Sequence, residues 1–189
     1  NLQLGADMTL FKKRYEEDTR LLNILKFAAD VCIIIVFAYA LILFTCDRTT
    51  LSGNSMESAI ASGDTVLINK MAYTLTSPSR YSVIAFKLPN VASSKVYVKR
   101  IIGLPGETVQ IKEGHVYING ALLENDISNE DILTKGLAGN EIILKADEYF
   151  VLGDSRNNSE DSRFASIGLV KKEDIIGSAW LVSSPLEHV

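Results

Sequence analysis

A run of apolar residues near the N-terminus dominates the hydropathy pattern. FAADVCIIIVFAYALILFTC, residues 27–46, is interrupted only by Asp30. About 20 apolar residues are enough for an α-helix to span the hydrocarbon core of a bilayer. A buried helix of a soluble domain is the alternative, but the isoleucine-rich run has no polar face to turn towards water. The pattern therefore predicts a transmembrane helix.

The charges that flank this run predict its orientation. Five basic residues precede it: Lys12, Lys13, Arg14, Arg20 and Lys26. Only Arg48, beside Asp47, follows at once, and basic residues collect on the cytoplasmic side of a membrane. The sequence after the run has no small-residue site typical of signal-peptide cleavage. We expect residues 1–26 to form a short cytoplasmic segment, residues 27–46 an uncleaved anchor, and residues 47–189 an extracytoplasmic domain.

Beyond the anchor, short runs of β-branched and aromatic residues alternate with turn formers. Six segments are predicted to be strands or hairpins: 64–70, 81–88, 95–102, 107–120, 141–154 and 175–182. Glu113-Gly114 marks a hairpin turn and an Asn-Gly pair closes the next strand, whereas residues 124–140 are polar and predicted to be a loop. No helix of any length is expected after residue 60. The pattern predicts a mostly antiparallel β domain.

Composition indicates the size and general class of the protein but not any reaction that it catalyses. The chain has 189 residues, 47% of them hydrophobic, and a formal net charge of −4. Its mean hydropathy is +0.15. This length suits one domain with an appendage, and no basic, aromatic-interleaved stripe suggests a nucleic-acid partner. Because residue 1 is Asn, we expect Met8 to be the natural start and residues 1–7 to be an addition from cloning.

The cysteines and histidines exclude several kinds of site. Cys32 and Cys46 would lie about 21 Å apart along one helix, too far to form a disulfide with each other. The only histidines, His115 and His188, fall at a hairpin tip and next to the C-terminus, which disfavours a Ser-His-Asp triad. The sequence has no zinc-ligand spacing. We expect no metal and no cofactor.

A pair of carboxylates that share a proton is another possible catalytic site, and two acidic residues lie close together in the sequence. Asp154 and Asp161 each have an arginine two residues further on, Arg156 and Arg163. That spacing favours two structural ion pairs over a carboxylate pair. A hydroxyl activated by a lysine is the chemistry that remains.

The candidate hydroxyl and amine lie in two separate stretches. TLSGNSMESAI contains Ser55, with Gly53 permitting a tight backbone turn and Met56 as an apolar anchor. Lys99 lies among branched apolar residues where a predicted strand meets the turn GLPG. Taken alone, the first stretch is typical of an ordinary turn, and Lys99 could be a surface lysine whose ammonium reaches water.

Four stretches, taken together and in order, resemble the successive sequence boxes of the type I signal peptidases. They are SGNSM (52–56), GDTVLINK (63–70), VKRIIGLPGE (98–107) and GDSRNNSEDSR (153–163). The resemblance runs from the anchor to the C-terminus and is to the single-anchor form found in Gram-positive bacteria. It implies a membrane-bound endopeptidase on an antiparallel, β-barrel-like scaffold, which removes signal peptides from exported preproteins.

The resemblance also implies roles for individual residues. Ser55 would be the nucleophile and Lys99 its general base. Ser159 would orient that lysine, Asp161 and Arg163 would form a supporting pair, and Asp154 and Arg156 would brace the same loop.

A lysine base needs an unusual environment. An unperturbed lysine has a pKa near 10.4, so roughly one in 2,500 is neutral at pH 7. Apolar walls would lower the pKa of Lys99 by desolvation, and Val98, Ile101 and Ile102 are the candidates. Strict strand alternation groups Lys99 with Tyr97, opposite Val98, and does not show which face is buried.

The sequence leaves part of the binding site open. The backbone N–H of Ser55 would supply one oxyanion donor. Gly53 stands where some family members have a serine that donates as well, and Ser52 is a poor substitute by register. The substrate should bind extended against a strand edge, either near 52–55 or 81–86, with small residues at the first and third positions before the cut.

Departures from the family pattern keep a second function open. SMESAI has Ser58 and Ala59 where Pro and Thr are common, Tyr81-Ser82 replace Gly-Asp, and FASI lengthens the segment before Gly168. These changes affect specificity more than chemistry. The alternative is a signal-peptidase-like assembly factor that binds pilin precursors without cutting them. A self-cleaving repressor relative is disfavoured because such proteins have no anchor.

Overall fold

The computed structural model describes residues 2–50, 53–57, 60, 62–89, 95–128 and 130–183. It divides into two compact units, Asn1–Phe44 and Thr45–Val189. Each unit is described by itself.

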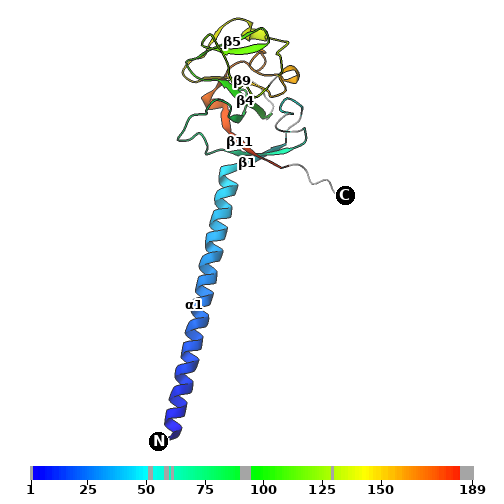
Figure 1. Cartoon of the computed structure of the whole chain (residues 1–189). Coiled ribbons are helices and arrows are strands. Elements are labelled where there is room, and N and C mark those ends of the chain that lie inside the picture. Colours follow the sequence, from blue (N-terminus) through cyan, green and yellow to red (C-terminus); the bar gives the residue numbers. More distant parts are fainter. Residues whose placement is uncertain are drawn as a thin grey trace. The chain divides into compact units, whose positions relative to one another are not determined.

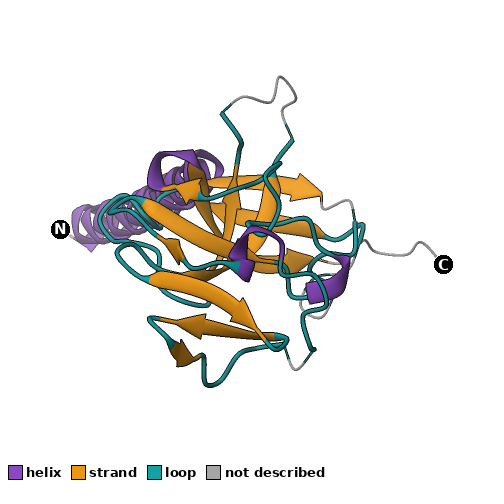
Figure 2. Ribbon diagram, turned by 90° about the horizontal axis from the view of Figure 1, so that it is seen from above, coloured by secondary structure: helices purple, strands orange, loops and turns teal. Residues whose placement is uncertain are grey.

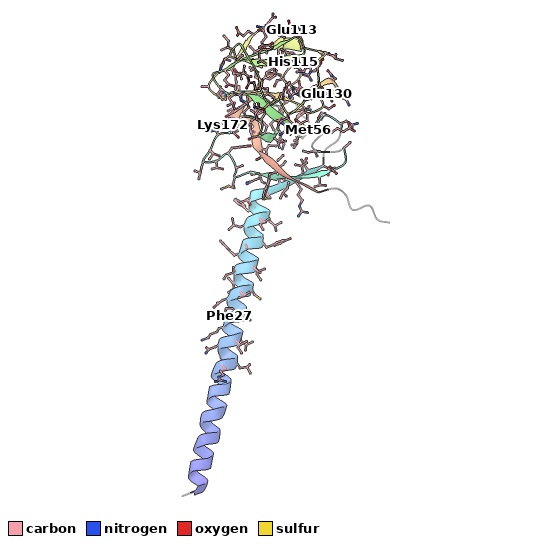
Figure 3. All side chains as sticks on the ribbon, in the orientation of Figure 1. Phe27, Met56, Glu113, His115, Glu130 and Lys172 are labelled. Atoms are coloured by element: carbon pink, nitrogen blue, oxygen red, sulfur yellow. The ribbon has the colours of Figure 1, made fainter. Side chains whose placement is uncertain are left out.

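The first unit is one long helix, α1 (Leu2–Thr45). Its stretch Arg20–Thr45 is long and apolar enough to cross a membrane, with a hydropathy of 2.6. Side chains such as Phe27 project outwards from this stretch (Figure 3), as expected of a helix whose surroundings are apolar. The helix differs from the prediction at both ends, because it continues through the basic segment and stops before Cys46.

The second unit consists of antiparallel strands in two sheets. The strands of the larger sheet, in spatial order, are β1 (Cys46–Thr50), β2 (Thr65–Asn69), β11 (Ile175–Ser183), β3 (Val83–Phe86), β4 (Tyr97–Gly103), β9 (Glu148–Leu152) and β10 (Val170–Lys171). Those of the smaller sheet are β7 (Ala121–Leu122), β6 (His115–Ile118), β5 (Thr108–Lys112) and β8 (Ile142–Ile143). Figure 2 shows strands and connecting loops making up nearly all of this unit. The predicted fold class, mostly antiparallel β after an N-terminal apolar helix, is confirmed.

All six predicted segments contain strands, but three strands were not predicted. β7 and β10 have two residues each, too few for a pattern. β1 has the sequence CDRTT, with no apolar alternation, and pairs with β2 from Cys46↔Asn69 to Thr50↔Thr65. After residue 60 the described chain has only short 3₁₀ helices: η1 (Gly136–Gly139), η2 (Arg156–Asn158) and η3 (Lys172–Asp174).

The predicted hairpin is confirmed at its turn. Glu113 and Gly114 both have positive φ, 51° and 82°, as the central residues of a type I′ turn require. Lys112 pairs with His115 across it, and Glu113 and His115 lie together at this end of the hairpin (Figure 3). Asn119-Gly120 makes a second turn of the same kind, which joins β6 to β7.

β4 holds the core together because it supplies a side chain to each of three apolar clusters. Ile102 packs in the cluster under the smaller sheet, Ile101 packs with Ile84 and Phe86, and Val98 packs with Met56. Each fully buried aliphatic side chain contributes about 1.5–3 kcal/mol. Figure 1 shows β4 and β9 in the middle of this unit, between β5 and β1. Lys99 therefore lies on a strand that is packed into all three clusters.

Candidate active site

A cleft of about 530 Å³ brings the two candidate stretches together. Its lining consists of Thr49, Thr50, Gly53, Asn54, Ser55, Met56, Lys95, Val96, Tyr97, Val98, Lys99, Asn158 and Glu160. Three segments far apart in the sequence thus meet in one concave site, namely the loop after β1, the first half of β4 and the loop after β9.

Ser55 is held by its neighbours in the loop after β1. Met56 is 1% exposed and packs in the apolar cluster of Val98, so the predicted anchor at this position is confirmed. Gly53 has φ 109°, a conformation that favours glycine, and its N–H donates to Ser62 Oγ at 3.2 Å. The carbonyl of Ser55 accepts from the N–H of Ser155 at 3.2 Å. Ser52 lies outside the described residues.

Lys99 is buried, which the sequence pattern alone did not show. Its side chain is 5% exposed, and the described residues give it no hydrogen bond and no ion pair. Desolvation by burial lowers the pKa of Lys99 to about 8. The negative charges of Asp161 and Glu160 oppose that shift, and the positive charges of Lys95 and Arg163 add to it. An amine with this pKa exists in part as the neutral base near physiological pH.

The apolar wall beside Lys99 differs in part from the predicted one. Val98 lines the cleft as expected, together with Met56 and Val96. Ile101 and Ile102 are fully buried but do not line it, because they pack into the two other clusters. The strand thus distributes successive apolar side chains among separate clusters, and a contribution of Ile101 and Ile102 to the desolvation of Lys99 stays a prediction.

Ser159 has a buried hydroxyl on the loop that approaches Ser55. In the described part of the chain its Oγ has no hydrogen-bond partner. A Cβ on Gly153 would lie 2.2 Å from Ser159 Oγ and 2.5 Å from the carbonyl oxygen of Ser55. Gly153 therefore allows the loop after β9 to approach Ser55. Sequence reasoning missed this role, although the glycine opens the box GDSRNNSEDSR.

Asp161 and Arg163 form the predicted ion pair. Arg163 Nε lies 2.7 Å from Asp161 Oδ1, Arg163 Nη2 lies 2.9 Å from Asp161 Oδ2, and both side chains are fully buried. Asp161 also accepts from the N–H of Gly153 at 3.1 Å. The pair therefore fixes the loop that carries Ser159.

The second predicted pair, Asp154 with Arg156, is wrong. Asp154 accepts two hydrogen bonds from Arg100, at 2.7 Å from Nε and 2.6 Å from Nη2. Arg156, at the start of η2, instead donates to both carboxylate oxygens of Asp126. Asp154 and Arg156 each have a partner of opposite charge, because an unpaired buried charge is strongly destabilising. In both cases the partner belongs to another part of the chain and is not the residue two positions away.

One of the two predicted substrate-binding edges is not available. β3 is paired on both sides, with β11 and with β4, so residues 83–86 present no free edge. β9 pairs with β4 only from Arg100 onwards. On the β9 side, none of the described strands pairs with the first residues of β4, Tyr97 to Lys99. This part of β4 is therefore a free edge, and it lines the cleft.

The cleft contains the groups needed for acyl transfer by a hydroxyl and a neutral amine. Within the described ranges, no cluster of three or more His, Cys, Asp or Glu side chains could hold a metal ion. The hydroxyl of Ser55 and the buried amine of Lys99 line one cleft on an antiparallel β scaffold, and a second buried hydroxyl, that of Ser159, lies on the loop that approaches Ser55. Together with an apolar helix suited to a membrane, they define the class of a membrane-anchored peptidase.

Comparison with known proteins identifies the family. Residues 24–183 match the family described as "Signal peptidase, peptidase S26". The chain therefore belongs to this family and is a peptidase of the signal peptidase I type, which processes signal peptides.

Similar proteins come from several bacteria. A probable signal peptidase I-2 of Synechocystis sp. is 32% identical over 82% of this chain and 71% of its own length. Signal peptidase I P of Bacillus subtilis subsp. natto is 31% identical over 95% of this chain and 98% of its own. The crystal structure of a signal peptidase I from Enterococcus faecalis V583 is 34% identical and covers 57% of this chain and 100% of its own, with a TM-score of 0.44.

Proposed function

We propose that the protein is a membrane-anchored endopeptidase that removes N-terminal signal peptides with a Ser55/Lys99 dyad, cutting after small residues. The observation that carries this proposal is the burial of Lys99, without a charge partner among the described side chains, in the same cleft as Ser55. A structural lysine would be paired or exposed. A buried, unpaired amine is suited to take up a proton.

In the proposed mechanism, neutral Lys99 takes the proton of Ser55 Oγ as that oxygen attacks the scissile carbonyl carbon. The tetrahedral intermediate collapses as the C–N bond breaks, and the departing amine takes the proton from Lys99. The mature protein leaves, and the signal peptide remains as an ester on Ser55. Lys99 then takes a proton from a water molecule as its oxygen attacks the ester carbonyl carbon. The C–O bond to Ser55 breaks, Lys99 returns the proton to Ser55 Oγ, and the signal peptide leaves with a new C-terminal carboxyl group.

The groups around the dyad have supporting roles. Ser159 would orient the amine of Lys99, and the Asp161–Arg163 pair would fix the loop that carries Ser159. The backbone N–H of Ser55 would stabilise the oxyanion. Gly53 has no hydroxyl to add a second donor, and the described residues do not supply an obvious one.

The preprotein would bind as an extended strand along the open edge of β4, where its backbone can pair with Tyr97 and its neighbours. Val96, Val98 and Met56 supply the apolar lining for shallow pockets. Small side chains at the first and third positions before the cut would fill them.

The membrane is the second partner of the protein. The helix fits a membrane anchor, and the excess of basic residues before its apolar stretch favours a cytoplasmic N-terminus. Residues 47–189 would then meet preproteins after export. The alternative, a factor that binds pilin precursors without cutting, is disfavoured because both Ser55 and Lys99 are in the cleft.

The dyad is tested by replacing each member in the full-length protein in detergent. Ser55→Ala and Lys99→Met should each abolish cleavage of a generic preprotein, a loss of at least about 10³-fold, and the double variant should be no worse because the pair acts as a unit. Lys99→Arg should fail as well, since a guanidinium stays protonated.

A pilin precursor assayed in parallel separates the two functions. Binding of that precursor by wild type without cleavage of either substrate would favour the assembly factor. Retained cleavage in a Ser55 or Lys99 variant would remove that residue from its role.

A further inference from the structure

Two charged side chains line the cleft without a part in the proposed mechanism. Besides Lys99, the described lining contains one further cation, Lys95, and one anion, Glu160. Both side chains are exposed. A charge at the mouth of a substrate cleft attracts or repels charged side chains of the substrate. These two residues are therefore candidates for determining substrate specificity.

The strand register separates the two charges along the cleft. Lys95 lies four residues before Lys99, about 13 Å along an extended chain. Leu152, the last residue of β9, pairs with Arg100. Gly153 follows at the level of Lys99 and approaches Ser159, so Glu160 lies at the Lys99 end of the cleft. Glu160 therefore lies on the side of Lys99, and Lys95 lies several substrate residues away.

Glu160 is held in place by a residue of the segment FASI. Ser166 Oγ donates to Glu160 Oε1 at 2.6 Å. The charge of Glu160 raises the pKa of Lys99 and the charge of Lys95 lowers it, so both fields reach the reacting amine. The carboxylate is therefore oriented by Ser166 on the side of the cleft that lies towards Lys99.

The direction in which the substrate lies follows from the lining of the cleft. Its apolar side chains, Val96, Val98 and Met56, are suited to the small residues before the cut, and Val96 and Val98 lie between Lys95 and Lys99. The signal-peptide side of the substrate then runs towards Lys95. The first residues of the mature protein leave past Lys99, on the side of Glu160.

We infer that Glu160 is a specificity-determining residue, which favours preproteins with a cationic side chain directly after the cut and disfavours those with an anionic one. This inference rests on the proposed function. It adds a charge selection on the mature side of the cut, separate from the shallow pockets that accept small residues on the other side.

The test uses two preproteins that differ only in having Lys or Asp at the first position after the cut. Full-length wild type in detergent, assayed at one pH and low salt, should show a kcat/KM about three- to tenfold higher for the Lys substrate, since attraction and repulsion of exposed charges add. Glu160→Gln should bring the ratio close to one, and Glu160→Lys should invert it. Because each ratio compares two substrates on one enzyme, any change in the protonation of Lys99 cancels.

Controls separate this role from a general electrostatic or structural effect. Glu173→Gln makes the same chemical change at an exposed residue that does not line the cleft, and it should leave the ratio unchanged. Ser166→Ala should weaken the discrimination, and 0.5 M salt should nearly remove it.

The outcomes also separate this inference from the proposed function. Cleavage of both substrates at equal rates by wild type, or a ratio that Glu160→Gln leaves unchanged, would overturn the inference alone. No cleavage of either substrate by wild type would overturn the proposed function and the inference with it.

Discussion

Lys99 can accept a proton only in its neutral form, and the side chains around it decide at which pH that form exists. Burial removes water from the ammonium and favours the neutral amine, while Asp161 and Glu160 favour the ammonium. Desolvation is the larger effect, so the pKa of Lys99 falls to about 8 and stays above neutrality. At pH 7 about a tenth of the molecules would have a neutral base, compared with roughly one in 2,500 for a free lysine.

The pH dependence of cleavage follows from this balance. Neutral Lys99 becomes more abundant as pH rises, so kcat/KM should increase through an apparent pKa of about 8 and level off above it. A profile of kcat/KM from pH 6 to pH 10, with a substrate that does not titrate in this range, measures the midpoint. A midpoint near 10 would mean that Lys99 is solvated, and it could not then be the general base.

Ser159→Ala is the matched variant for this profile. Its hydroxyl is neutral and does not appear among the causes that shift the pKa of Lys99. Its loss should lower the plateau rate and leave the midpoint nearly in place, as expected of an orienting residue. A large shift of the midpoint with an unchanged plateau would assign Ser159 an electrostatic role.

At the level of elements, the loop 123–140 and the loop 153–163 depend on each other. Arg156 and Asp126 join them through two charge-assisted hydrogen bonds. Asn157 Nδ2 donates to the carbonyl of Asp131 at 2.9 Å, and Arg163 Nη1 donates to that of Thr134 at 3.1 Å. A polar segment that the sequence predicts to be a simple loop therefore braces the segment that carries Ser159.

Replacing Asp126 tests this brace. Asp126→Asn leaves the guanidinium of Arg156, which is 1% exposed, without its counter-charge. Because Asp126 is itself 17% exposed, we expect a loss of about 1–3 kcal/mol in the free energy of unfolding, below the cost of breaking a fully buried pair. Urea denaturation of the full-length protein in detergent measures the loss, and the pH midpoint of activity should not move.

Asp131→Asn is the control for that variant. The side chain of Asp131 is 74% exposed, and its contact with the brace is made by the backbone carbonyl. A change below about 0.5 kcal/mol is expected. Equal losses in the two variants would show that the Arg156–Asp126 pair has no special part in holding the loop.

Ion pairs and edges show why only part of the site follows from the sequence. Ser55 and Lys99 can be picked out because their stretches resemble, in order, the sequence boxes of the type I signal peptidases; taken alone, neither stretch is distinctive. The spacing of two residues correctly predicts the ion pair between Asp161 and Arg163. The same spacing gives the wrong partner for Asp154, which pairs with Arg100, 54 positions away on β4. The free edge of β4 depends on where β9 begins to pair, and no local pattern encodes that register.

At the level of the whole molecule, the strongest signals in the sequence are those of the longest segments. The apolar stretch of α1 and the alternating strands are readable because burial repeats along them. β1 is not predicted from the sequence because its residues do not alternate between apolar and polar. Backbone pairing with β2 holds this strand in the sheet, and it has no apolar face. The helix fits a membrane anchor for the peptidase unit. The side of the membrane on which the cleft lies would decide which proteins the peptidase can reach.

The topology can be tested directly. The excess of Lys and Arg before the apolar stretch favours a cytoplasmic N-terminus, so residues 47–189 should lie outside the membrane. A protease added to intact spheroplasts should digest this part, and a tag at the N-terminus should survive until the membrane is permeabilised. If the tag were lost and residues 47–189 protected in intact spheroplasts, the orientation would be reversed. The cleft would then face unexported preproteins, and removal of signal peptides after export would have to be abandoned as the function even with an intact dyad.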